Sequence, residues 1–132
     1  MADTWEPRRA VSLDLAQLER FITLVRDGHL DDLDAHMRTP DVEAGGLMHL
    51  PDDVWAEFLA AAALDDASLV DLLRFFTVAE MQLRGWKCGA TSPVIPIARA
   101  LRARGAWRPE LARWIRERSD NRFLPYGSIQ GL

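Results

Sequence analysis

The sequence predicts an all-α protein, a single-domain bundle of about five to six helices. A central apolar helix is expected near residues 66–83, followed by a C-terminal helical hairpin. Alanine and leucine are the commonest residues, and β-branched residues are few, which favours helix over sheet. Apolar residues recur at spacings of three and four, and Gly or Pro separates the segments that show this pattern. The length of 132 residues is enough for one domain with a hydrophobic core.

The first part of the chain is predicted to hold a loose arm and two helices. Residues 1–11 have no helical periodicity and form the arm. Ser12 is a candidate cap for the first helix, which ends at Gly28, in the position where glycine commonly terminates helices. A short second helix is expected over about residues 31–37.

The next part of the chain contains the longest stretch predicted to be irregular, residues 39–51, which Pro and Gly residues punctuate. A third helix begins at Asp52 or Asp53, where an acidic side chain suits the positive end of the helix dipole. Residues 60–63 are all alanine, so another helix can approach closely there.

The central helix near residues 66–83 is capped by Asp65 and is apolar around most of its circumference, a pattern typical of a helix in the middle of a bundle. Ser92 caps the fifth helix, with Pro93 at its first position, and Pro109 begins the sixth. The last two helices form the predicted hairpin.

The remaining features bear on location and on the chain's end. There is one cysteine, so no internal disulfide is expected and a reducing compartment is indicated. The N-terminus lacks the apolar region of a secretory signal, and no apolar run is long enough to cross a bilayer, so we expect a cytoplasmic protein that does not enter a membrane. The strong excess of arginine over lysine suggests a GC-rich, bacterial genome. Residues 119–132 are predicted to form an irregular tail docked on the body.

Charge is distributed unevenly along the chain. Residues 1–80 carry 17 acidic and 6 basic side chains, and residues 81–132 carry 3 acidic and 10 basic ones. This layout has two interpretations: the halves attract each other within the fold or in a dimer, or the basic half binds an anionic partner. We favour the internal explanation, because nucleic-acid-binding domains are usually basic overall.

Glu80 lies within the apolar stripe of the predicted central helix. A lone buried carboxylate is costly unless it is paired or protonated. We expect a core ion pair with an arginine, Arg84, Arg113 or Arg122 being the candidates. The alternative is a carboxylate held in a pocket.

The loop over residues 85–93 leads into a helix N-terminus. Free backbone N–H groups, the Ser92 hydroxyl and Lys87 are the elements of an anion site. The competing interpretation is an ordinary capped helix with Trp86 inserted into the core, which we favour because such a cap is expected in any helix. Cys88 is interpreted as a small buried hydrophobe and not as a nucleophile, since no histidine is near it in the sequence.

The C-terminal hairpin also has the outline of a helix-turn-helix, with phosphate contacts from arginines. Glu110 and Glu117 in the second helix argue against this, and no Asn or Gln is placed there to read bases. A simple helical hairpin with outward arginines is favoured. The arginines concerned are Arg99, Arg102, Arg108, Arg113 and Arg116.

Two further groups of residues are candidates for binding. His29, Asp32 and His36 have helical spacing that suits a metal, and His49 follows them. A solvated face is favoured because structural zinc sites usually show tightly paired ligands. We therefore predict no metal and no cofactor. In the tail, interface-type residues form either a lid over the core or a recognition surface; they are Arg122, Phe123 and Tyr126.

The sequence contains no assembled catalytic set, so we expect a small helical adaptor or accessory domain that binds a protein partner or forms a homodimer. Nucleic-acid binding through the Arg-rich hairpin is the alternative. A small-ligand or anion-binding protein that uses Glu80 and residues 86–93 is the third hypothesis.

Overall fold

The computed structural model describes residues 13–38, 43–121 and 124. Within them the chain forms six α-helices and no strand, which confirms the predicted fold class. Three short 3-10 turns join the helices: η2 (Leu30–Asp32), η3 (Glu43–His49) and η4 (Gly89–Thr91). The helices are α2 (Leu15–Arg26), α3 (Leu33–His36), α5 (Asp52–Ala61), α6 (Asp66–Gln82), α7 (Val94–Ala103) and α8 (Pro109–Arg118).

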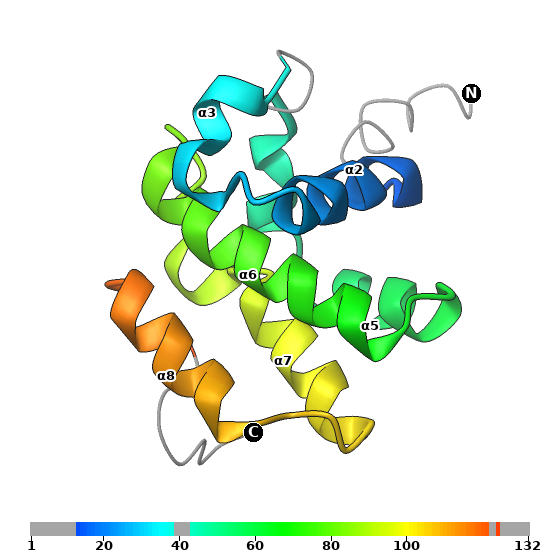
Figure 1. Cartoon of the computed structure of the whole chain (residues 1–132). Coiled ribbons are helices and arrows are strands. Elements are labelled where there is room, and N and C mark those ends of the chain that lie inside the picture. Colours follow the sequence, from blue (N-terminus) through cyan, green and yellow to red (C-terminus); the bar gives the residue numbers. More distant parts are fainter. Residues whose placement is uncertain (1–12, 39–42, 122–123, 125–132) are drawn as a thin grey trace, which may run out of the picture.

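Helix α6 is the centre of the bundle, as predicted. It contacts α2, α3, α7 and α8, while α5 packs against α7 (Figure 1). Eight of its residues are buried, and they occupy more than one face of the helix. Together with α2, α5, α7 and α8 they enclose a single hydrophobic core.

An aromatic cluster fills the middle of this core. The rings of Phe21 and Phe75 stack with centroids 4.2 Å apart. Trp55 meets the ring of Phe76 edge-on at 5.5 Å. Trp86 is fully buried and contacts three phenylalanines, so the loop that follows α6 is inserted into the core as the sequence indicated. Such offset and edge-on pairs add to the stabilisation from burial alone.

Aspartate side chains cap the N-termini of two helices, α6 and α2. Asp65 caps α6 as predicted, by accepting a hydrogen bond from Ser68 N at 2.8 Å. The cap of α2 differs from the prediction: it is Asp14, whose carboxylate accepts from Ala16 N at 3.0 Å. Aspartate and serine cap helices about equally well, so their order in the sequence does not decide between them. Ser12 lies outside the described residues.

The segments between α2 and α5 depart from the prediction in detail. The second helix begins as the 3-10 turn η2 and ends at His36, because the next residue, Met37, has an extended backbone with φ −88° and ψ 136°. Part of the stretch predicted to be irregular forms η3 instead. Within it, Leu47 and Met48 are buried and anchor the segment to the core.

The C-terminal hairpin is present. α8 begins at Pro109, as predicted. α7 is assigned from Val94, but Pro93 already has helical angles (φ −61°, ψ −19°), and the Ser92 hydroxyl accepts a hydrogen bond from Val94 N at 3.2 Å. Beyond α8, Leu124 is buried against the core.

Several expectations fall outside the described residues, namely those for the N-terminal arm and, in the tail, for residues 122, 123 and 125–132, which include Arg122, Phe123 and Tyr126. In the described part of the chain, no helix is long and apolar enough to cross a membrane.

Candidate functional site

Glu80 is buried at the junction of three segments, with 3% of its surface exposed. Its Oε2 accepts a hydrogen bond from Ser92 Oγ at 2.5 Å, and its Oε1 accepts one from Asn121 Nδ2 at 3.1 Å. Asn121 also donates to the backbone carbonyl of Gly89 at 2.9 Å. The carboxylate therefore joins α6, the loop before α7 and the segment after α8.

Two of the three arginines predicted to pair with Glu80, Arg84 and Arg113, do not bond it, and the third, Arg122, lies outside the described residues. The hydrogen bonds that the structure describes for Glu80 come from Ser92 and Asn121. These partners are a hydroxyl and an amide, both neutral, and Arg84 and Arg113 are exposed. Neutral donors satisfy a carboxylate without bringing a second charge out of water, and desolvating a second charge is the main cost of a buried ion pair. Asn121 carries no helical pattern that would have identified it as the partner.

The pKa of the Glu80 carboxyl lies above its ordinary value of 4.5. Burial is the largest cause, because desolvation disfavours the charged form. The hydrogen bonds from Ser92 and Asn121 act in the opposite direction, since they favour the carboxylate. Asp120 adds a smaller upward shift and Lys87 a smaller downward one.

The loop before α7 uses its polar groups within the fold. The Lys87 ammonium lies 3.3 Å from the carboxylate of Asp120, as an exposed ion pair. The Thr91 hydroxyl is 2.7 Å from the carbonyl oxygen of Met48. Burial, with the negative charge of Glu80 as a second cause, raises the pKa of the Cys88 thiol to about 12. With the Ser92 hydroxyl bonded to Glu80, this loop has the character of a structural junction.

The arginines of the hairpin divide into two groups. Some face the acidic half of the chain: Arg99 Nη1 lies 2.8 Å from the Asp52 carboxylate, and Arg104 donates to the carbonyl of Leu64 at 2.7 Å and to the Asp66 carboxylate at 3.2 Å. These contacts support the internal interpretation of the uneven charge for α7.

The other group lies mainly on α8. Arg113 and Arg116 are exposed, and neither has a hydrogen bond or ion pair to any residue that the structure describes. Arg102 on α7 is half-buried and engaged within the fold. α8 therefore presents two arginines to solvent that no described residue pairs.

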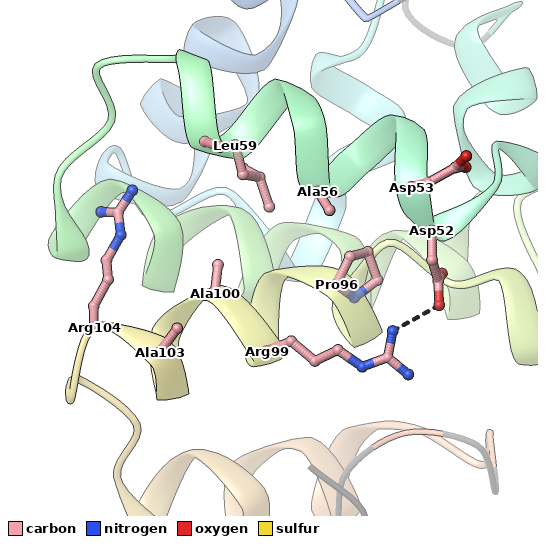
Figure 2. A pocket seen from close by; sticks show the side chains of 10 residues that line it. Asp52, Asp53, Ala56, Leu59, Pro96, Arg99, Ala100, Ala103 and Arg104 are labelled. Atoms are coloured by element: carbon pink, nitrogen blue, oxygen red, sulfur yellow. Dashed lines mark hydrogen bonds and ion pairs between the residues drawn. The ribbon is translucent and has the colours of Figure 1, made fainter.

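A groove with a volume of about 700 Å³ lies between α5 and α7. Leu59 and Ala56 project into it from α5, and Pro96 and Ala100 line its opposite side (Figure 2). Ala60 and Ala103 complete its apolar lining. Small side chains thus leave an open channel where two helices lie side by side.

Charged side chains mark the ends of this groove. Asp52 and Asp53 lie at the end where α5 begins, and Arg104 lies at the opposite end (Figure 2). Asp52 is engaged by Arg99, whereas Asp53 is exposed and has no hydrogen bond or ion pair with the residues described. No pattern in the sequence identified this groove, although the alanines at 60–63 indicated a place where another helix approaches closely.

Comparison with known proteins provides no relative: no family model, no curated protein and no solved structure matches this chain.

Proposed function

We propose that the protein is an accessory domain that binds an amphipathic helix of a partner protein in the groove between α5 and α7. The observation that carries the proposal is the groove itself, an open apolar channel of about 700 Å³ bordered by charged side chains at its ends. Binding a helix by its apolar face in such a groove is a recurrent mode of protein recognition. A cytoplasmic location in a bacterial cell is part of the proposal and rests on composition alone.

The dimensions of the groove define how much of a helix it can hold. α5 has 10 residues, so its axis is about 15 Å long at 1.5 Å per residue. A partner helix lying along it contributes about three turns, with apolar residues three and four positions apart facing the lining alanines. The buried surface is small, which is typical of transient complexes.

The charged side chains at the two ends of the groove favour opposite charges on the partner helix. Asp52 and Asp53 at one end favour a Lys or Arg on the partner helix, and the Asp53 carboxylate is available for it. Arg104 at the other end is already engaged by Leu64 and Asp66 and contributes a weaker preference for an acidic residue. The proposed ligand is therefore a helix with a small apolar stripe and a basic residue near one end.

A groove-filling substitution tests this proposal. Ala56 is exposed and points into the groove, so Ala56→Trp fills the channel without disturbing the core (Figure 2). Ala16→Trp, at an exposed position on α2, adds the same side chain away from the groove. A selection from a displayed library of amphipathic helices is made against the wild-type protein, and the selected peptides are measured against both variants.

We expect the selected helices to carry a basic residue at one end, to bind both the wild type and Ala16→Trp, and to lose at least about tenfold in affinity for Ala56→Trp. Selected helices that bind Ala56→Trp as tightly as the wild type would place the interaction elsewhere. A second copy of the chain is the other possible occupant. In that case the wild type sediments as a dimer at micromolar concentration and Ala56→Trp as a monomer.

Nucleic-acid binding is the second candidate, and the exposed arginines of α8 are the observation in its favour. It predicts an affinity that falls steeply as salt is raised, because binding releases counterions from the phosphates. Arg113→Ala combined with Arg116→Ala would reduce that salt dependence in a gel-shift titration. A lack of any shift at low ionic strength would eliminate this candidate. The pairing of Arg99 with Asp52 weighs against it.

A further inference from the structure

Three potential metal ligands lie close together in the segment that runs from the end of α2 to the end of α3. The imidazole rings of His29 and His36 are stacked with centroids 3.7 Å apart and planes inclined by 22°. His36 Nε2 lies 3.3 Å from Asp32 Oδ2. One ligand atom from each of the three residues lies within 4.8 Å of the other two. His29 is half-buried, while Asp32 and His36 are exposed, so the cluster is accessible from solvent.

The backbone that carries these ligands is fixed at its start. Gly28 has a φ of +83°, a left-handed conformation that glycine adopts readily, and it turns the chain sharply after α2. His29 N then donates to the Leu24 carbonyl at 3.0 Å, and Asp32 N donates to the His29 carbonyl at 3.2 Å. The backbone positions of the first two ligand-bearing residues are thus fixed relative to each other.

The side chain of Gln82, on the central helix α6, holds the same segment in place. Gln82 Nε2 donates to the Leu30 carbonyl at 2.6 Å, and Gln82 Oε1 accepts from Leu33 N at 3.0 Å. Leu33 is fully buried in the core. Because one amide holds two backbone groups that lie between His29 and His36, the ligand-bearing segment is held before any ion arrives. Such prior organisation of the supporting structure is what a binding site requires.

We infer that His29, Asp32 and His36 form a binding site for a divalent first-row transition ion, with Zn²⁺ as the best match. Imidazole nitrogen and carboxylate oxygen bind Zn²⁺ at about 2.0–2.2 Å. Tetrahedral geometry then places neighbouring ligand atoms about 3.3–3.5 Å apart. The His36–Asp32 distance of 3.3 Å already corresponds to one edge of that tetrahedron.

His29 completes the site by a side-chain movement. The lone pairs of two stacked rings lie in nearly parallel planes and do not meet at one point, so at least one ring must rotate out of the stack. The rotation involves side-chain torsions and leaves the backbone anchored by Gln82 in place. Three protein ligands leave a coordination position for water or for a group from another molecule. Hard cations such as Mg²⁺ prefer all-oxygen sites and fit this cluster poorly.

The structure shows that the three side chains lie close together, which their spacing in the sequence could not establish. Helical spacing alone is equally consistent with a solvated polar face, and the segment is in fact partly 3-10 and partly α. The convergence depends on the Gly28 turn, which brings His29 back over His36.

Titration of the untagged full-length protein with Zn²⁺ tests the inference, with Co²⁺ as a spectroscopic substitute that absorbs visible light when it is bound by nitrogen and oxygen. His36→Ala removes one ligand from an exposed position. Asp34→Asn alters a neighbouring exposed carboxylate that is not part of the cluster and serves as the matched control. Cys88→Ala excludes a contribution from the thiol. Circular dichroism checks that each variant is folded.

We expect one Zn²⁺ to bind per chain, with affinity reduced at least about tenfold in His36→Ala and unchanged in Asp34→Asn and Cys88→Ala. Mg²⁺ at the same concentration should not compete. The inference is overturned if Zn²⁺ fails to bind, if His36→Ala binds it as well as the wild type, or if binding is lost with Cys88→Ala. The test is independent of the groove, because Ala56→Trp should bind Zn²⁺ normally.

Discussion

The buried carboxylate of Glu80 makes a prediction about stability that distinguishes two substitutions. Glu80→Ala removes the acceptor of both the Ser92 hydroxyl and the Asn121 amide. Each buried donor left without an acceptor costs about 1–3 kcal/mol. We therefore expect the free energy of unfolding to fall by about 2–6 kcal/mol at neutral pH, as measured by urea denaturation.

Glu80→Gln should behave differently. The glutamine keeps the volume of the side chain, its Oε1 accepts from Asn121, and its Nε2 donates to Ser92 Oγ. The two contacts survive without a buried charge, but the Ser92 hydroxyl hydrogen loses its acceptor. The free energy of unfolding at neutral pH should therefore fall by about 1–3 kcal/mol, less than in Glu80→Ala, because one donor and not two is left without an acceptor.

The comparison with Glu80→Gln also depends on pH in a defined direction. The pKa of Glu80 is raised in the folded state, so the native protein holds this proton more tightly than the unfolded chain does. Below the ordinary pKa of 4.5 the carboxyl is protonated in both states. As pH rises from there through the raised pKa of the folded state, the wild type loses stability relative to Glu80→Gln, and above that pKa the difference stays constant.

Urea denaturation of both proteins at a series of pH values measures this difference, and other carboxyl groups cancel because the two proteins share them. A wild type that gains stability relative to Glu80→Gln as pH rises would refute the reasoning. That result would mean that the hydrogen bonds from Ser92 and Asn121 outweigh burial and lower the pKa.

Three other properties can be measured directly. The exposed pair of Arg99 and Asp52 should show a coupling of less than about 1 kcal/mol in a double-mutant cycle, and a coupling above about 2 kcal/mol would contradict that view. Phe21→Ala, which removes a ring stacked on Phe75 at 4.2 Å, should lower the free energy of unfolding by about 3–5 kcal/mol; a loss below about 1 kcal/mol would contradict the packing. Because its pKa is raised to about 12, the Cys88 thiol should react with iodoacetamide at pH 8 more than about 100-fold slower in the folded protein than in urea. Equal rates would show that the thiol is not desolvated.

The sequence predicted the helices well where a repeating apolar pattern coincided with a clear start or stop. α6 has both, with the Asp65 cap and a broad apolar surface. α8 has Pro109 at its start. The prediction was less exact over residues 30–49, because 3-10 turns have no extended periodicity that a pattern can identify.

The candidate sites depended more on tertiary contacts. The position of Glu80 indicated a buried carboxylate, but not that Asn121, 41 residues further on, would bind it. Hydrogen bonds between distant neutral side chains leave no charge or spacing signal in one sequence. The groove could not be predicted for a similar reason, since it depends on how α5 lies against α7 and not on either helix alone.

The long separation between Glu80 and Asn121 has a consequence for synthesis on the ribosome. The chain emerges from its N-terminus, so α2 through α7 leave the ribosome before residue 121 does. During that interval the Glu80 carboxyl has Ser92 as a partner but lacks its second donor. The Glu80 carboxyl therefore gains its full set of hydrogen bonds only when residue 121 has left the ribosome, and a product truncated before Asn121 lacks the donor to Glu80 Oε1.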